Sequence, residues 1–215
     1  MMQMRRLGLT SLILVGLASA AMAQQWELGG MAGAGFLKGL PVSAPAGAAT
    51  AGFQTGAAFG GFFGQNLYKH LSGEVRYNYL QSNLHLSSGG TDASFSGSSH
   101  LLYYDMVLHT STRRERMEAF VAAGGGMRIF RGTGTEAAYQ PLSQYAIFTK
   151  TQVLKPMASV GAGLKFSVAR NVYLRTEFRD FITAFPTELI TPAPGAKISG
   201  LLHDFVPMVS LSITF

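Results

Sequence analysis

Residues 158–167 read ASVGAGLKFS, and the apolar side chains fall on every second position of this stretch. Successive side chains of a β-strand point to opposite faces, so a period of two predicts a strand. Serine, glycine and lysine hold the intervening positions. We therefore predict a strand here with one apolar face and one small or polar face. The apolar face consists of Ala158, Val160, Ala162, Leu164 and Phe166.

The same period recurs along the chain and predicts eight strands. They lie at residues 26–36, 53–63, 72–79, 102–109, 121–129, 158–167, 172–179 and 209–215. Short connections at 64–70, 111–117 and 169–171 alternate with long ones at 39–49, 87–99, 132–151 and 185–200. Short periplasmic turns and longer extracellular loops are typical of an outer-membrane barrel. The predicted fold class is all-β, an eight-stranded antiparallel up-and-down transmembrane β-barrel. A soluble β-sandwich also holds such strands, but it explains neither this rhythm nor charges in mid-strand.

The composition supports a chain that buries much apolar surface. Charged residues make up 13% of the sequence, against about 25% in ordinary soluble domains. The 47% hydrophobic and 11% aromatic residues exclude disorder of the charged, low-hydrophobicity kind. Cysteine is absent, which excludes disulfides and thiolate metal sites. Mean hydropathy is +0.21 without a long apolar run after Gln24, as expected when lipid-facing residues alternate with polar ones.

The N-terminal segment has the pattern of a signal peptide. Arg5 and Arg6 precede an apolar core at residues 7–17, and Ala21-Met22-Ala23 stands before a cleavage point at Gln24. We therefore expect residues 1–23 to be cleaved and residues 24–215 to form the barrel domain. The mature part keeps 15 basic and 11 acidic residues, too thin an excess to indicate nucleic acid as a partner. The expected location is the outer membrane of a Gram-negative-type bacterium.

The glycine-rich strands and the last strand carry a family resemblance. The stretches GMAGAGF (30–36), VAAGGGMRIF (121–130) and the terminal VSLSITF (209–215) resemble the small outer-membrane proteins of the OmpA-like and OmpW-like type. The resemblance implies outer-membrane lipid as surroundings. It also implies that the outer-membrane assembly machinery reads the C-terminal strand, through Val209, Leu211, Ile213 and Phe215. Because the sequence ends at Phe215, the cell-wall anchoring role of longer family members is not expected.

The candidate site consists of charged residues on the polar face of the predicted strands, at the positions that alternate with the apolar ones. Eight strands enclose an interior that side chains just fill, and five positive and four negative groups would share it. Near-neutral balance favours a network that plugs the lumen over a charge-selective lining, which needs one sign in excess. The predicted network consists of Glu27, Glu74, Arg76, Asp105, Arg128, Lys165, Arg175, Glu177 and Arg179.

Other constellations give weaker signals. His85 and His100 flank the second long loop and would face each other across a hairpin, but two imidazoles make an incomplete metal site. Ser99 and His100 with Asp92 are the nearest candidate for a catalytic triad. Common catalytic and phosphate-binding motifs are absent. We therefore expect no enzyme activity, no cofactor and no metal.

Three functions remain open from the sequence. The favoured interpretation is a structural or surface-exposed barrel with a charge-plugged lumen. The alternatives are a narrow conduit for small or apolar solutes and, third, a lipid-modifying outer-membrane enzyme. The sequence indicates neither a ligand nor an oligomeric state.

Overall fold

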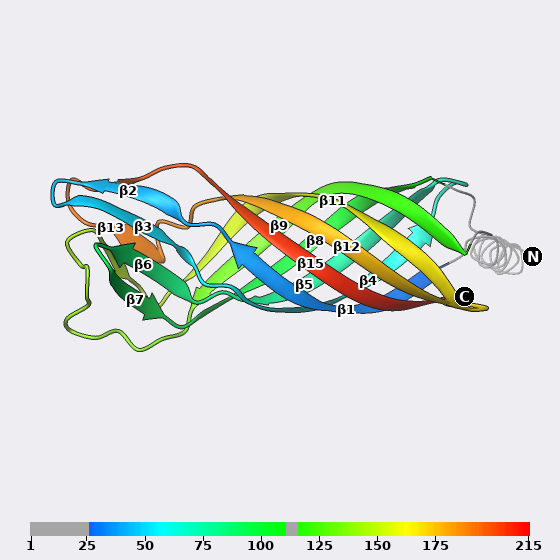
Figure 1. Ribbon diagram of the computed structural model, residues 1–215, viewed down its shortest axis with the longest axis horizontal. Helices are drawn as coiled ribbons and strands as arrows, with labels where there is room; N and C mark the ends of the chain where they lie inside the picture. Colours follow the sequence, from blue (N-terminus) through cyan, green and yellow to red (C-terminus); the bar gives the residue numbers. More distant parts are fainter. Residues whose placement is uncertain (1–25, 111–115) are drawn as a thin grey trace, which may run out of the picture.

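The computed structural model describes residues 26–110 and 116–215. The predicted signal peptide and most of the predicted turn at 111–116 lie outside these residues. Eight long strands form a closed antiparallel barrel (Figure 1), which confirms the predicted fold class. The barrel strands are β1 (Trp26–Leu37), β4 (Gly56–Asn66), β5 (Leu71–Gln81), β8 (Gly97–His109), β9 (Met117–Gly132), β11 (Gln152–Ala169), β12 (Val172–Ala184) and β15 (Leu201–Thr214).

The barrel closes where the first strand meets the last. β1 pairs with β4 on one side and with β15 on the other. The backbone N–H of Trp26 donates to the carbonyl of Phe215, and the N–H of Phe215 donates to the carbonyl of Trp26, both at 3.0 Å. The remaining barrel strands pair in chain order, each with the barrel strand before it and the barrel strand after it. Closure leaves no open edge, so the wall has only an inner and an outer face.

The barrel strands run further than the alternation predicted. β15 begins at Leu201 instead of Val209, β11 at Gln152 instead of Ala158, and β8 at Gly97 instead of Leu102. The predicted second strand began at Phe53, but that residue ends a different strand and the barrel strand starts at Gly56. The polar and small residues at these strand tops broke the apolar pattern without breaking the strands.

The long connections contain strands, so the prediction of loops at 39–49, 87–99 and 185–200 is wrong, whereas residues 133–145 hold no strand. Five strands form a second sheet in the order β14-β2-β3-β6-β7, and two more pair separately. A hydrophobic core unites them, which includes Phe53, Leu86, Phe148 and Leu189. We call this second body the lobe. Its strands are β2 (Leu40–Ala44), β3 (Gly47–Phe53), β6 (Leu84–Ser88), β7 (Thr91–Phe95), β10 (Ala146–Phe148), β13 (Ile190–Pro192) and β14 (Lys197–Ile198).

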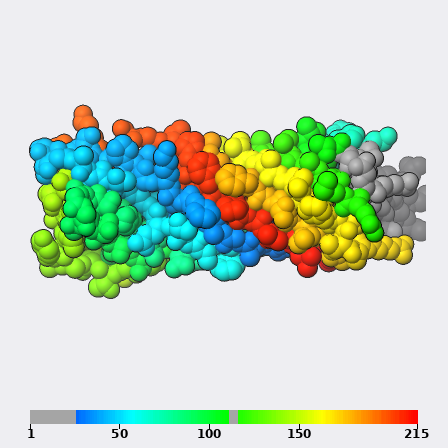
Figure 2. All heavy atoms as spheres, in the orientation of Figure 1, coloured from blue at the N-terminus to red at the C-terminus, as the bar shows by residue number. Residues whose placement is uncertain are grey.

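The lobe lies at one end of the barrel, and the short turns and the C-terminus lie at the other (Figure 1). In the space-filling view the lobe continues the barrel as one elongated body (Figure 2). No helix among the described residues is both long and apolar enough to cross a membrane.

Candidate functional site: the charged lumen

The structure places all nine predicted charged residues on the inner wall, where every one of them is buried. They come from six strands, β1, β5, β8, β9, β11 and β12. The alternation of the strands explains this, since most of their outward neighbours are apolar. The four arginines have no exposed surface at all. Buried charges are stable only when they are paired, so the pairing of these groups determines what the lumen can do.

Near the short-turn end, Lys165 and Glu27 form the lowest layer of the network. The Lys165 ammonium donates to Glu27 Oε2 at 2.6 Å, and the Ser212 hydroxyl donates to Glu27 Oε1 at 2.6 Å. Glu118 lies 3.9 Å from Lys165 and 3.1 Å from His109. This layer joins β1, β9, β11 and β15 across the lumen floor.

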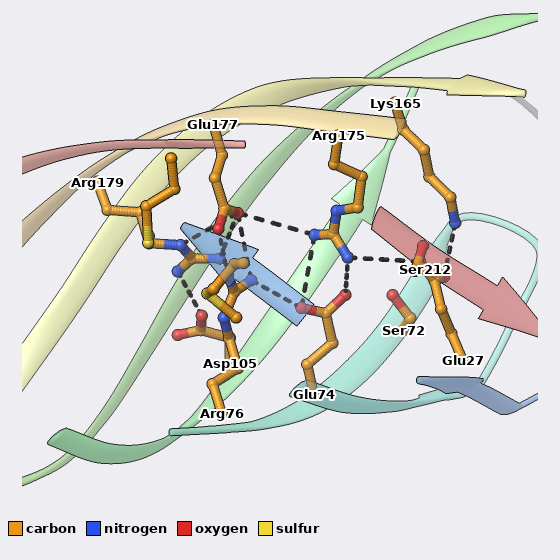
Figure 3. Close-up of polar contacts among 12 residues, drawn as sticks. Glu27, Ser72, Glu74, Arg76, Asp105, Lys165, Arg175, Glu177, Arg179 and Ser212 are labelled. Carbon is orange, nitrogen blue, oxygen red and sulfur yellow. Dashed lines mark hydrogen bonds and ion pairs between the residues drawn. The ribbon is translucent and has the colours of Figure 1, made fainter. Parts of the chain in front are cut away.

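The middle layer is a continuous chain of alternating charges (Figure 3). Arg175 donates to Glu74 at 2.7 Å, and Glu74 also accepts from Arg76 at 2.9 Å. Arg76 continues to Glu177, which accepts from Arg179 at 3.3 Å. Arg179 ends the chain on Asp105. Three arginines and three carboxylates therefore cancel one another within this layer.

Aromatic rings fill the space that the ion pairs leave. The guanidinium of Arg175 lies between the rings of Phe62 and Phe120, 4.6 Å from each centroid. Such cation–π contacts strengthen when they are desolvated. A Cβ atom built on Gly163 would lie 2.5 Å from the Phe120 ring, so glycine at this position makes room for that ring. At this level of the lumen, ion pairs and aromatic rings are therefore in direct contact.

The upper layer pairs Arg128 with Asp204. Arg128 also donates to the Ser99 hydroxyl at 3.2 Å, and its guanidinium lies 4.2 Å from the Phe130 ring centroid. Phe130 belongs to the hydrophobic core of the lobe. The charged lumen therefore passes directly into an apolar core at the lobe end of the barrel.

Sequence reasoning missed Asp204 and Glu118, two buried members of the network. Both precede the predicted starts of their strands, Glu118 by three residues and Asp204 by five, so they were not assigned to the polar face. The sequence does contain the pattern that would have found them. Asp204 lies an even number of residues from Ser210, and Glu118 lies an even number from Arg128, so each pair shares one face of its strand. With these two acids the lumen holds six carboxylates against five cationic side chains, and the near-neutral balance remains.

Comparison with solved structures identifies the fold. The crystal structure of OprG from Pseudomonas aeruginosa matches with a TM-score of 0.59 at 9% identity, covering 89% of this chain and 95% of that one. Neisserial surface protein A (NspA) matches with a TM-score of 0.53 at 10% identity, covering 89% and 97%. The N-terminal barrel domain of Pseudomonas aeruginosa OprF matches with a TM-score of 0.50 at 13% identity, covering 89% and 97%.

The chain has the fold of the small eight-stranded outer-membrane β-barrels. No protein-family model and no curated protein matches the sequence. Identities of this size show a shared fold and nothing about the activity of the chain.

The outer face of this barrel is apolar along its length. Large hydrophobic side chains are exposed on every barrel strand, among them Leu102, Leu154 and Phe178. The predicted assembly residues Val209, Leu211, Ile213 and Phe215 all lie on this outer face, exposed by about half or more of their surface. Their recognition by assembly machinery stays a prediction. Asp180 also faces outward, where its carboxylate accepts a hydrogen bond from His203 Nδ1 at 2.8 Å.

The two weaker candidate sites are not assembled. His85 lies in the lobe, 3.2 Å from Asp92, while His100 lies on the outer barrel wall and is hydrogen-bonded to the Tyr77 hydroxyl at 2.8 Å. Ser99 points into the lumen and bonds to Ser82 and Arg128. The predicted facing of the two histidines is wrong, because His85 pairs with Ser94 in the lobe sheet and His100 pairs with Tyr79 in the barrel. The predicted grouping of Ser99, His100 and Asp92 is also wrong, because Ser99 and His100 are neighbours on one strand and face opposite ways. No cluster of three metal-ligating side chains occurs within the described ranges.

Proposed function

We propose that this protein is an integral outer-membrane barrel of a Gram-negative-type bacterium that does not conduct solutes and presents its lobe at the cell surface. The observation that carries the proposal is the filled lumen. A buried charge network and an apolar cluster share the barrel interior, and Arg128 of the network contacts Phe130 of the lobe core.

Membrane insertion is supported by the outer face. Rows of exposed apolar side chains on a closed barrel favour lipid over water as surroundings. Short turns lie at one end and long connections at the other. In barrels of this fold the short turns are periplasmic, which would place the lobe on the extracellular side.

The network favours a plug over a selective pore. A selectivity lining needs one sign of charge facing water, whereas Glu74 and Glu177 each contact at least two arginines out of solvent. Both carboxylates are therefore paired within the protein instead of facing water. We also propose that the protein is not an enzyme, since the nearest candidate triad is dispersed over three places.

The surface of the lobe sheet suits presentation rather than transport. Its solvent-facing positions carry small and polar residues, including Ser43, Thr50 and Ser94. The opposite face of the same sheet packs onto the hydrophobic core. A sheet stabilised in this way offers a rigid surface beyond the membrane.

Planar-bilayer recording of the purified full-length protein tests the proposal. We expect no unitary conductance from the wild-type barrel. The double variant Glu74→Ala/Arg175→Ala removes a central ion pair together with its volume, and we expect it to raise ion leakage. The matched control Lys155→Ala/Glu188→Ala removes an ion pair at the edge of the lobe and should stay silent. Regular conductance steps from the wild type would contradict the proposal and support the conduit. Unchanged lipid composition in cells that express the protein is the expected result for a barrel that is not an enzyme.

A further inference from the structure

A groove of about 550 Å³ runs along the outer wall of the barrel below the lobe. It crosses β5, β8, β9 and β11, and its lining includes Tyr77, His100, Leu102, Met127, Arg131 and Leu154. Its size lies in the range of ligand sites, about 300 to 1,000 Å³. It opens outward, on the face that the proposed function places in lipid.

The lining changes from apolar to polar toward the lobe. Leu102 and Met127 lie opposite each other on β8 and β9 and are 59% and 41% exposed. Two residues further toward the lobe, His100 is held by the Tyr77 hydroxyl and contacts the edge of the Tyr79 ring. Aromatic side chains with a polar tip are typical of the membrane–water boundary.

A polar row lies above these rings. Arg131 on β9 is directly opposite Gln152 on β11 and Ser98 on β8, and Ser98 is opposite Gln81 on β5. Four adjacent strands thus carry a polar residue at one level of the sheet, three of them exposed and Ser98 buried. This row marks where the outer wall leaves the apolar region, so Arg131 lies at headgroup depth if the barrel is in a membrane.

Arg131 is the one lysine or arginine on the outward parity of the described barrel strands. Arg131 is exposed, and it takes part in none of the ion pairs found among the described residues. The other barrel-strand arginines, Arg76, Arg128, Arg175 and Arg179, are fully buried and paired. A single unpaired guanidinium at the polar end of an apolar groove is complementary to an anion that carries a hydrocarbon chain.

We propose that this groove binds a phosphate-bearing lipid of the outer leaflet, with the phosphate on Arg131 and Gln152 and one acyl chain along Leu102, Met127 and Leu154. The proposal rests on the proposed membrane location. A lipid fits better than free phosphate because the greater part of the lining is apolar and faces the same surroundings as the rest of the wall.

Site-specific quenching tests the proposal, and the absence of cysteine from the chain permits a single label. Gln81→Cys carries a fluorophore two strands from Arg131, about 10 Å away. The full-length protein is placed in phosphatidylcholine bilayers that contain acyl-nitroxide phosphatidic acid or acyl-nitroxide phosphatidylcholine. We expect the phosphatidic acid to associate about fivefold more strongly, the equivalent of about 1 kcal/mol for one basic residue near an anionic surface.

Arg131→Gln should remove the preference, and Arg131→Lys should keep most of it. The matched control Arg170→Gln removes the same charge from the exposed turn at the opposite end and should leave the preference unchanged, as should millimolar inorganic phosphate. Equal quenching by both lipids, or a full preference in Arg131→Gln, would overturn the lipid site while the membrane location stands. Displacement by inorganic phosphate would overturn the choice of a lipid. Absence of quenching by either lipid would overturn both proposals.

Discussion

Glu177 is a carboxylate on which three arginines converge. Arg76 forms an ion pair with it, Arg179 lies 3.3 Å away and Arg175 lies 3.9 Å away, all without solvent exposure. Glu177→Ala leaves these charges partly uncompensated in a packed interior. Breaking a buried pair in this way costs on the order of 3 to 5 kcal/mol. We expect a loss of that size in the free energy of unfolding, measured by denaturant titration in detergent.

Glu188→Ala is the matched control for this loss. Its partner is Lys155 at 2.7 Å, and half of the Glu188 side chain is exposed. Exposed pairs contribute roughly 0 to 1 kcal/mol, so the control should change stability little. A loss below about 1 kcal/mol for Glu177→Ala as well would indicate a wet lumen and remove the plug.

Gly163 tests the packing of the lumen rather than its charge. An added Cβ would meet the Phe120 ring at 2.5 Å and the backbone carbonyl of Thr176 even more closely. We expect Gly163→Ala to cost about 1 to 3 kcal/mol through overpacking. Gly30→Ala is the control, because nothing lies within 4 Å of its Cβ position on the outer wall. Equal stability of the two variants would contradict a tightly packed interior at this level.

Parity alone placed the nine predicted lumen residues on the inner wall, since a strand has only two faces. It could not supply the partners. Arg175 pairs with Glu74 on β5, 101 residues away, and that contact depends on barrel closure and stagger. The apolar alternation also did not extend to the strand ends, which is why Asp204 was missed.

β15 closes the barrel, and Phe215, the residue that follows it, can be tested directly. The backbone of Phe215 makes two hydrogen bonds to Trp26, while its ring is 64% exposed. Deletion of Phe215 removes both of these terminal hydrogen bonds and the ring, whereas Phe215→Ala removes only the ring. If the ring is the assembly signal that the family resemblance implies, both variants should lower the heat-modifiable fraction in the outer membrane and leave export intact.

Phe178→Ala is the control for this experiment, because Phe178 is an outward-facing aromatic residue in the middle of β12 that is 53% exposed. It should assemble normally. Loss of assembly in the deletion but not in Phe215→Ala would attribute the effect to strand closure instead of recognition. Normal barrel levels in both variants would contradict a role of Phe215 in assembly.

The contact between β11 and the β12–β13 connection gives a pH dependence. Lys155 Nζ donates to Glu188 Oε1 at 2.7 Å, and this hydrogen bond lowers the pKa of Glu188 from its usual 4.5. A carboxyl group whose pKa is lower in the folded than in the unfolded state stabilises the protein at pH above its unfolded-state pKa. This contribution is lost as pH falls through the folded-state pKa. Lys155→Met should therefore raise the pKa of Glu188 toward 4.5 in a carboxyl NMR titration.

The same variant should be slightly less stable than the wild type near neutral pH, by less than about 1 kcal/mol. The difference should vanish below the folded-state pKa of Glu188. Lys197→Met, on β14, is the control and should leave the titration of Glu188 unchanged. A stability difference that persists in acid would indicate that packing of the Lys155 stem matters, not the ion pair.

The strands of the lobe show where the sequence signal was overlooked. Gly89 and Gly90 both have positive φ, 58° and 82°, as a two-residue hairpin turn requires. Leu84 and Leu86 before them, and Ala93 and Phe95 after them, alternate with polar residues. The Ser/Gly composition suggested a loop, but the glycine pair between alternating apolar residues indicates a hairpin.

Across the molecule as a whole, two interiors of different composition share one set of strands. The barrel interior combines buried ion pairs with an apolar cluster that includes Phe181 and Val206, whereas the lobe is held by apolar contacts between segments far apart in the sequence, such as Val42, Leu86 and Ile190. Phe130 and Leu202 at the tops of barrel strands belong to the lobe core. The barrel therefore supplies part of the surface on which the lobe packs.

This asymmetry predicts that the lobe can open while the barrel stays closed. Leu189 is fully buried in the lobe, so Leu189→Ala should cost about 2 to 5 kcal/mol of local stability. Hydrogen exchange in detergent should then show lost protection in β3 and β6, with β9 and β11 unchanged near Ala123 and Val160, because cooperative units open separately. Leu154→Ala, on the outer wall and 55% exposed, should change neither region. Equal loss of protection in the lobe and in mid-barrel would show that the two bodies unfold together. That result would contradict opening of the lobe with a closed barrel.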